Sequence, residues 1–431
     1  MSRRRSVVIV PLLALLVAGG IAAAMVSRTT TDVVLRTVTV GHAPYWTLAL
    51  DERTGRAFIF NRQDGTLNVL DTRTGALLRT VTLAPGNVWL AVAERAGRVF
   101  VSGYDTGTIT MLDARSGAVL HSVANGTDMG LAVDERTNRV FVGSVNSTVI
   151  MLDARSGIIL RHLPACYEPF AVAVSVRTGH VFAKCDDGTT DMLDTRTGRV
   201  LRKIANNSGS YGSMLVDERT NRVFTVGNQP QLDVLDARTG AYLHTIAFDA
   251  TALGPVADER TGRVYLTLGD ANAVTAPPHK SEVVVLDGQS GALLRRVPVA
   301  ANPFSLAVDP RTGHVLVGSA GPLDSLSDLP TGDGTLSVLD AARGRVLRAI
   351  RIGASPSDVA IDARAERALV VNSYSDTHGK GALKAWRPRE GWWPRALRRI
   401  KQVICCLPFQ APPPPSPTTN GTVTTLDLSR F

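Results

Sequence analysis

The residues most suggestive of chemistry in this sequence are an aspartate and an arginine that recur together in a short turn. The fullest copy is Leu235-Asp236-Ala237-Arg238-Thr239-Gly240, and a carboxylate beside a cation is a common arrangement in acid–base catalysis. An enzyme needs one such centre, so repetition indicates a structural turn, in which the aspartate bonds nearby backbone amides and the glycine takes a positive φ. Near copies of the Leu-Asp pair stand at Leu70-Asp71, Leu112-Asp113, Leu152-Asp153, Leu193-Asp194, Leu286-Asp287, Leu339-Asp340 and Leu426-Asp427.

The segments between these turns predict a repeated four-stranded unit. Residues 88–123, for example, contain four short runs rich in Val, Phe, Thr and Leu, separated by turn residues. No helical period links the runs, so we expect an antiparallel meander of strands a, b, c and d, with the aspartate turns closing the a–b and c–d hairpins. Four-stranded units of about 40 to 45 residues are typical of β-propeller blades.

The strands of this unit resemble the YVTN-type β-propeller repeat family. The family's Tyr-Val-Thr-Asn strand corresponds here to FIFN at 58–61, FVSG at 100–103, FVGS at 141–144 and LVVN at 369–372. Its Val-x-Val-Ile-Asp strand corresponds to LNVLD at 67–71 and TLSVLD at 335–340. The resemblance runs from Val33 to Leu428 outside one insertion, although no blade carries the literal tetrapeptide. It implies a propeller fold and says little about function, because one fold hosts many chemistries.

The two ends of the repeat region predict how the ring closes. Residues 33–40 form a lone d-type strand, whereas the last unit ends after a c-type strand at 422–428. Pairing these strands completes one blade and removes open sheet edges. We therefore predict an all-β, eight-bladed propeller of four-stranded antiparallel blades over residues 33–431, with seven blades as the alternative.

The N-terminal segment, residues 1–28, predicts export. Arg3, Arg4 and Arg5 precede an uncharged apolar run at 7–26, long enough for one hydrophobic helix across a bilayer. Basic residues before such a run favour an N-terminus inside and the remainder outside. Because 22–24 offers a signal-peptidase site, a cleaved signal peptide and a retained membrane anchor both stay open. We expect an extracytoplasmic protein, membrane-anchored or secreted.

The charge distribution argues against general nucleic-acid binding. The formal net charge is +9, but the excess lies in the leader and in residues 380–401, and the rest of the repeat body is almost neutral. Binding to a phosphate backbone normally needs a broad basic excess. Binding of single-stranded nucleic acid is therefore kept only as an alternative that depends on the basic insertion.

Long connections mark one face of the predicted ring as the binding face. The a–b and c–d turns are short and uniform, whereas the b–c connections are long at 269–281, 319–334 and 373–421. Long loops on a rigid scaffold are where binding usually occurs. For Trp46 and Trp89, which begin inner strands, the alternative is that they fill space near the axis. The aromatic and histidine residues that we predict to line the binding mouth are His42, Tyr45, Trp46, Trp89, Tyr104, Tyr167, Tyr211, His279, Tyr374 and His378.

The insertion in the last blade, residues 374–421, predicts a basic amphipathic helix and a Pro-rich tether. Trp393, Leu397, Ile400 and Ile404 recur at helical spacing, with Trp392 beside them and basic residues elsewhere on the wheel. Such a helix can lie on a membrane surface or bind a partner, and the alternative is that it folds onto its own propeller. The prolines at 412–415 favour an extended chain.

The cysteines predict no zinc site. Cys166 and Cys185 fall in one blade and on one face, so a disulfide between them is one of two open outcomes in an exported protein. Cys405 and Cys406 are adjacent in the insertion, and no role follows from their sequence. Two distant pairs lack the spacing of a zinc site.

The remaining residues favour a non-catalytic binding scaffold. The sequence contains no nucleophile elbow, phosphate-binding glycine loop, dinucleotide fingerprint or haem-attachment motif. We predict no catalytic residue, no metal ligands and no cofactor, and a monomeric ring with an unidentified protein or small-molecule partner. Glu168, Asp186, Asp187 and Asp270 could meet in the channel. The alternative function is therefore a metal-assisted hydrolase or lyase acting on a small molecule there, and a channel-bound metal stays open.

Overall fold

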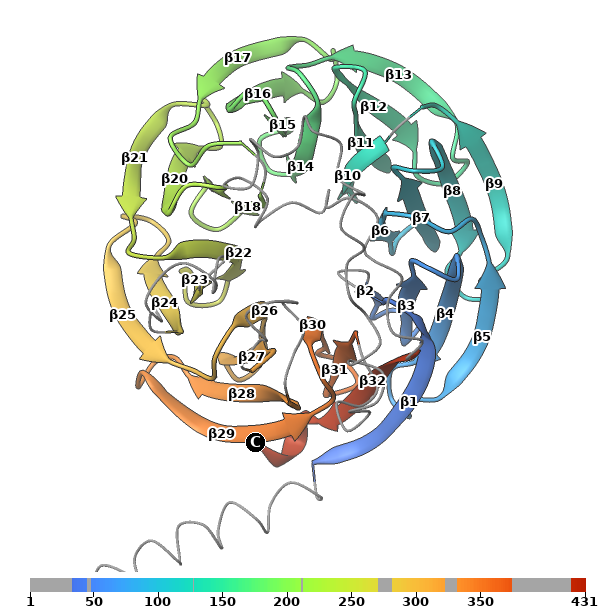
Figure 1. Cartoon of the computed structure of the whole chain (residues 1–431). Coiled ribbons are helices and arrows are strands. Elements are labelled where there is room, and N and C mark those ends of the chain that lie inside the picture. The colour runs from blue at the N-terminus through green and yellow to red at the C-terminus, as the bar shows by residue number, and fades with distance from the viewer. Residues whose placement is uncertain are drawn as a thin grey trace, which may run out of the picture.

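A computed structural model describes residues 33–44, 48–126, 128–210, 212–269, 281–321, 332–373 and 420–431. Its strands form eight four-stranded antiparallel sheets. The sheets stand around a central axis in a closed ring (Figure 1). The chain is an eight-bladed β-propeller, which confirms the fold predicted from the repeat and makes the seven-bladed alternative wrong.

Each blade runs from an innermost strand a to an outermost strand d. The a strands are β2 (Leu48–Asp51), β6 (Val88–Ala93), β10 (Asp128–Asp134), β14 (Pro169–Ser175), β18 (Met214–Asp217), β22 (Thr251–Asp258), β26 (Pro303–Val308) and β30 (Pro356–Asp362). The b strands are β3 (Arg56–Asn61), β7 (Arg98–Gly103), β11 (Arg139–Ser144), β15 (His180–Cys185), β19 (Arg222–Val226), β23 (Arg263–Gly269), β27 (His314–Ser319) and β31 (Arg367–Asn372). The c strands are β4 (Thr66–Asp71), β8 (Thr108–Asp113), β12 (Thr148–Asp153), β16 (Thr189–Asp194), β20 (Gln231–Asp236), β24 (Glu282–Asp287), β28 (Gly334–Asp340) and β32 (Asn420–Asp427). The d strands are β5 (Leu77–Thr82), β9 (Val119–Ala124), β13 (Ile159–Pro164), β17 (Val200–Ala205), β21 (Tyr242–Ala247), β25 (Leu293–Pro298), β29 (Arg345–Ile352) and β1 (Val34–His42).

The first and last strands of the chain share the eighth blade. β1 pairs antiparallel with β32, with Thr37 opposite Thr424 and Val38 opposite Val423. The sheet order is β1-β32-β31-β30, and in Figure 1 the blue β1 lies outside the red β32. This pairing confirms the predicted closure, and β1 extends to His42, beyond the expected residues. A short 3-10 helix, Leu428–Arg430, follows β32.

The hydrophobic core lies on the b and c strands and between neighbouring blades. Phe58 and Phe60 of β3, for example, pack in one cluster with Val99 and Val101 of the next blade. Full burial of one such side chain contributes roughly 1.5–3 kcal/mol. The same place in strand b carries a buried aromatic ring in six successive blades: Phe58, Phe100, Phe141, Phe182, Phe224 and Tyr265.

The aspartates of the Leu-Asp pairs build the c–d turns. Asp236 Oδ1 accepts hydrogen bonds from the backbone N–H groups of Arg238 (3.0 Å) and Thr239 (2.8 Å). Its Oδ2 pairs with Arg222 Nη1 at 3.0 Å, and Gly240 closes the turn with a φ of +65°. These contacts make Asp236 part of the scaffold, as its repetition predicted.

The same contacts set the acidity of these aspartates. Burial raises the pKa of Asp236, but the hydrogen bonds from Thr239 and Arg238 and the charge of Arg222 outweigh burial and hold the pKa below its usual range. The pKa is lowered at every aspartate of the motif: Asp71, Asp113, Asp153, Asp194, Asp236, Asp287, Asp340 and Asp427.

Two predicted segments lie outside the described residues. These are the N-terminal segment 1–28 and residues 374–419 of the insertion 374–421. The second segment contains the predicted amphipathic helix at 392–407 together with Cys405 and Cys406. Within the ranges that the structure does describe, no helix is long and apolar enough to cross a membrane.

Candidate binding faces

The ring has two faces that differ in their connections. The loop face carries the d–a and b–c connections, and the turn face carries the a–b and c–d turns. The described ends of the three long b–c connections follow β23, β27 and β31 and precede β24, β28 and β32, so they all open on the loop face. Of the predicted mouth residues, the structure describes His42, Trp89, Tyr104 and Tyr167. The others lie outside the described residues, as do those of the predicted insertion helix: Tyr45, Trp46, Tyr211, His279, Tyr374, His378, Trp392, Trp393, Leu397, Ile400 and Ile404.

His42 is held at the edge of the loop face by one carboxylate. Its backbone N–H donates to Asp64 Oδ2 at 2.7 Å, and its Nδ1 lies 2.8 Å from Asp64 Oδ1. Asp64 belongs to the b–c turn of the first blade, so the pair ties the closing strand β1 to that blade. This contact indicates that His42 has a structural role where the closing strand meets the first blade.

Trp89 takes part in an aromatic contact near the axis. Its ring meets Phe170 edge to face, with centroids 6.3 Å apart and an interplanar angle of 90°. The two rings come from β6 and β14, on either side of the third blade. Gly130 of β10 lets the backbones of β10 and β14 approach, because a Cβ at this position would lie 2.8 Å from the carbonyl oxygen of Phe170. The contact agrees with the alternative in which Trp89 fills space.

Tyr104 and Tyr167 gather around Glu168 on the same side of the ring. A hydrogen bond with Glu168, together with its charge, raises the pKa of Tyr167. Burial, followed by the charges of Glu168 and Asp105, raises the pKa of Tyr104. The side chain of Tyr167 is exposed, with 55% of its surface accessible. We call Tyr104, Tyr167 and Glu168 the tyrosine cluster.

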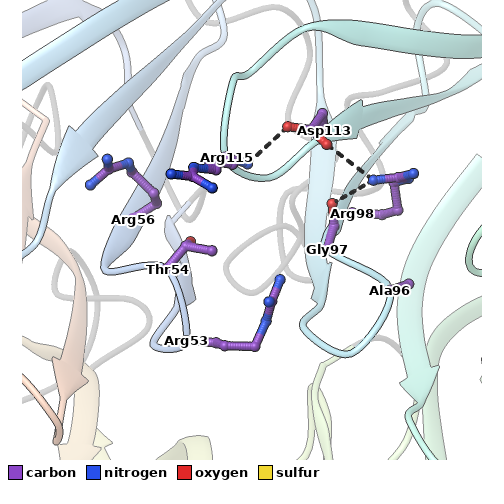
Figure 2. Close-up of a pocket in the computed structure, with 8 residues that line it drawn as sticks. All are labelled: Arg53, Thr54, Arg56, Ala96, Gly97, Arg98, Asp113 and Arg115. Carbon is purple, nitrogen blue, oxygen red and sulfur yellow. Dashed lines mark hydrogen bonds and ion pairs between the residues drawn. The ribbon is translucent and has the colours of Figure 1, made fainter.

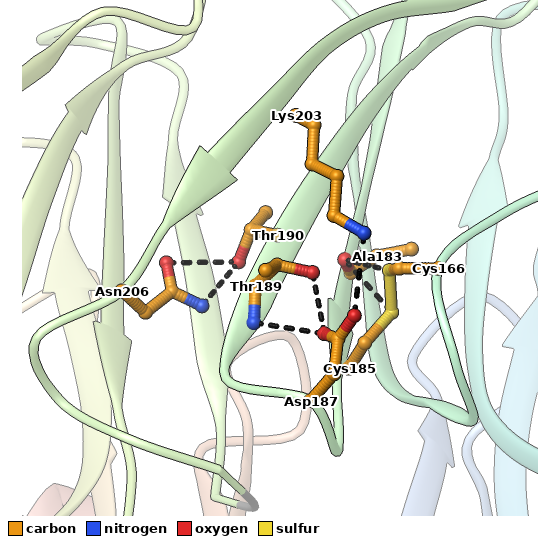
Figure 3. Close-up of a disulfide and its surroundings, with 8 residues drawn as sticks. All are labelled: Cys166, Ala183, Cys185, Asp187, Thr189, Thr190, Lys203 and Asn206. Carbon is orange, nitrogen blue, oxygen red and sulfur yellow. Dashed lines mark hydrogen bonds and ion pairs between the residues drawn. A yellow bond between two sulfur atoms is a disulfide. The ribbon is translucent and has the colours of Figure 1, made fainter.

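A disulfide braces the loop that carries Tyr167 and Glu168 of this cluster. Cys166 and Cys185 are joined, with their Cα atoms 5.9 Å apart, and Figure 3 shows the bond beside Asp187 and Lys203. The backbone N–H of Asp186 donates to the carbonyl of Tyr167 at 3.1 Å, and Glu168 has a φ of +49°. A left-handed glutamate costs energy and persists only where its surroundings fix it. The loop is therefore preorganised.

Asp187, one of the carboxylates predicted to meet in the channel, is held by partners within the fourth blade. Asp187 Oδ1 accepts from Thr189 N at 3.0 Å, and its Oδ2 pairs with Lys203 at 3.3 Å. In the described part of the chain, the one group of three candidate metal ligands is Cys166, Cys185 and Asp187. Cys166 and Cys185 are bonded to each other in the disulfide, so their sulfur atoms are not thiolate ligands. Asp270 lies outside the described residues.

The turn face carries an arginine ring that sequence reasoning missed. In several blades this arginine donates to a backbone carbonyl of the next blade: Arg53 Nε to Glu94 O at 2.9 Å, and Arg219 Nη1 to Glu259 O at 2.8 Å. The partners lie about one repeat apart in sequence, so only the placement of the blades reveals the link. The third residue of each a–b turn is an exposed arginine: Arg53, Arg95, Arg136, Arg177, Arg219, Arg260, Arg311 and Arg364.

A buried polar network joins the fourth and fifth blades. Lys184 is fully buried on β15, and its Nζ donates to Gly209 O at 2.7 Å and to Ser208 Oγ at 3.2 Å. Burial lowers the pKa of Lys184 to about 8, against the opposing charge of Asp233. Asp233 is also buried, and it accepts from Ser208 N at 2.7 Å and from the Tyr242 hydroxyl at 2.8 Å. Lys184 and Asp233 therefore both have hydrogen-bond partners across this interface, which indicates that the network has a structural role.

Known proteins share this fold. Residues 63–217, from the first blade to the fifth, match the protein family described as outer membrane protein assembly factor BamB (PQQ_2). The chain is a β-propeller repeat protein. The crystal structure of the computationally designed Ika8 protein is similar, with a TM-score of 0.62 and 20% sequence identity over 79% of this chain and 96% of that chain. A search of curated proteins found no match. Likeness at this identity shows the fold alone, and the YVTN assignment in particular stays a prediction.

Proposed function

We propose that the protein is an exported or membrane-anchored scaffold that binds a protein partner through its loop face, without catalysis. The observation that carries the proposal is the tyrosine cluster, in which Tyr167 projects from a loop braced by the Cys166–Cys185 disulfide. Tyrosine is enriched among the residues that dominate binding energy at protein interfaces. Its large contact area costs little side-chain entropy.

Preorganisation of the loop supports this proposal. Binding loses affinity when a loop must be ordered at the moment of contact, so a loop already fixed by a covalent bond and by backbone hydrogen bonds starts with an advantage. Tyr167 stands exposed beside Glu168, which adds a carboxylate at the rim of the contact. An exposed aromatic ring suits a protein surface better than it suits a small molecule, which favours concave sites.

Two features support export. Disulfides persist in oxidising compartments outside the cytoplasm, and the segment 1–28 has the basic start and apolar run of a signal or anchor. We expect mass spectrometry of protein isolated under alkylating conditions to find the peptides of Cys166 and Cys185 cross-linked. Free, alkylated thiols at both positions would contradict an oxidising location.

Site-specific photo-crosslinking tests the binding face. A benzophenone amino acid is placed at Tyr167, or at Arg196 on the turn face of the same blade, in the full chain expressed in its own cells. Arg196 is exposed, so it is a matched control. We expect one discrete protein adduct from position 167 and none from 196. Adducts from 196 alone, or from neither position, would overturn the proposal.

A further inference from the structure

A cavity opens on the turn face between the first and second blades, on the side opposite the tyrosine cluster. It encloses about 530 Å³, within the range of small-molecule sites. Figure 2 shows its lining, in which Arg53 and Arg56 come from the first blade and Arg98, Arg115 and Asp113 from the second. Four guanidinium groups therefore border one hollow that contains one carboxylate.

The positive charge of this cavity is only partly compensated. Arg98 pairs with Asp113 at 3.1 Å, and Arg56 pairs with Asp71 at 3.0 Å. Arg53 donates to the backbone carbonyl of Glu94, which is neutral. The backbone N–H of the exposed Arg115 donates to Asp113 Oδ1 at 3.2 Å, but its guanidinium group has no carboxylate partner among the described residues. Two of the four guanidinium charges thus stay available to an anion.

The second blade departs from the repeat where the cavity forms. In the third and fifth blades the fourth residue of the a–b turn is a threonine whose hydroxyl donates to the first residue, an aspartate: Thr137 to Asp134 and Thr220 to Asp217, both at 2.6 Å. The second blade has alanine at both places, and one of them, Ala96, lines the cavity. Ala96 leaves space where those blades have a threonine. Ala93 stands where they have an aspartate, so one carboxylate is missing from the surroundings.

We propose that this cavity binds a phosphorylated small molecule of the sugar-phosphate class. Guanidinium groups present forked donors that match phosphate oxygens in geometry and in charge. The volume exceeds that of a phosphate group alone, so the ligand carries an organic part. The lining has no aromatic ring on which a nucleobase could stack, which favours a polar sugar. The site lies on the face opposite the proposed protein contact, and neither proposal depends on the other.

Calorimetric titration with fructose 1,6-bisphosphate tests the proposal on the full chain, with unphosphorylated fructose as the uncharged comparison. We expect the bisphosphate to bind and fructose not to bind. Arg115→Gln should weaken binding about tenfold or more, because it removes one charge-assisted contact. Ala96→Thr should weaken binding by filling the cavity, and it keeps the residue that other blades carry. Arg238→Gln changes the equivalent exposed arginine of the fifth blade and should leave binding unchanged.

Several results would overturn the proposal. The first is that titration with millimolar fructose 1,6-bisphosphate releases or absorbs no heat of binding. The others are that fructose binds equally well, or that Arg115→Gln and Arg238→Gln lose the same amount of affinity. A parallel flotation assay uses vesicles containing a phosphatidylinositol phosphate, because a lipid headgroup offers the same chemistry. Vesicle binding without binding of the soluble bisphosphate would assign the site to a membrane and contradict the soluble ligand.

Discussion

Single residues settle what the repeated Leu-Asp turn does. The repetition was enough to predict that Asp236 is structural, because a turn needs the same side chain in every copy whereas a reaction needs it once. The full set of hydrogen-bond partners of Asp236 could not be predicted from the sequence, because one partner, Arg222, lies on a neighbouring strand of the blade. The result is a set of aspartates that stabilise the c–d turns most strongly when ionised.

Replacing one of these aspartates should destabilise the ring modestly. Asp236→Ala removes the acceptor of the Arg238 and Thr239 amides and the partner of Arg222. We expect a loss of about 1–2 kcal/mol, seen as a lower apparent melting temperature at pH 7. Because the folded pKa is lowered, the stability that this carboxylate contributes is present above about pH 4 and is lost as pH falls further. The difference between wild type and variant should therefore shrink towards pH 3, and a constant difference would refute the electrostatic part of this account.

At the scale of elements, the a–b turns act as links between blades. The sequence predicted their hairpin geometry, because Asp and Gly or Asn occupy fixed positions in the turn. It did not predict that the arginine between them bonds the next blade and the glutamate the preceding one, since those contacts depend on how one blade is placed against another. Glu218, for example, accepts hydrogen bonds from the backbone N–H groups of Val176 and Arg177 in the preceding blade.

Removing one such link should cost more than removing the same residue where it makes no link. Glu218→Ala leaves the amides of Val176 and Arg177 without their acceptor, and we expect a loss of about 1–3 kcal/mol. Glu259→Ala changes the same turn position in the sixth blade, where the described structure shows no hydrogen bond to the carboxylate. Thermal unfolding of both variants checks the contrast. Equal melting temperatures for the two variants would show that the interblade bonds contribute nothing measurable.

The interface between the fourth and fifth blades should respond to alkaline pH through Lys184. Its pKa is lowered to about 8 in the folded chain, so between pH 8 and the ordinary lysine pKa the unfolded chain binds more protons. The contribution of Lys184 to stability therefore rises with pH over that window and is lowest below it. We expect wild type to gain melting temperature relative to Lys184→Met between pH 7 and 9.5. An unchanged difference would contradict the buried, charged state of the lysine below pH 8.

At the scale of the whole molecule, ring closure could be predicted because the strand missing from one end was the spare strand at the other. The contents of the two faces could not be predicted in the same way. The Trp89–Phe170 contact joins residues from blades that are not sequential neighbours, and the arginine-lined cavity is bordered by turns from two neighbouring blades. The aromatic contact and the cavity both depend on how the blades are placed in three dimensions, which the sequence repeat does not specify.

Closure should depend on the last strand and not on the insertion before it. Deleting residues 420–431 removes β32 and exposes edges of β31 and β1, so we expect aggregation. Replacing 374–419 with a short Asn-Gly turn should leave a folded monomer, because Asn372 is paired with Thr422 and the two strands are already adjacent. Size-exclusion chromatography and circular dichroism compare the two. A soluble, folded protein after the first change would contradict the closure.

The central claim is that the loop face binds a protein partner through Tyr167. Its most direct test is the affinity of the partner that cross-links at position 167, measured for wild type, Tyr167→Ala and Arg196→Ala. We predict a loss of about tenfold or more for Tyr167→Ala and no change for Arg196→Ala. An unchanged affinity in Tyr167→Ala, or a larger loss in Arg196→Ala, would contradict the account.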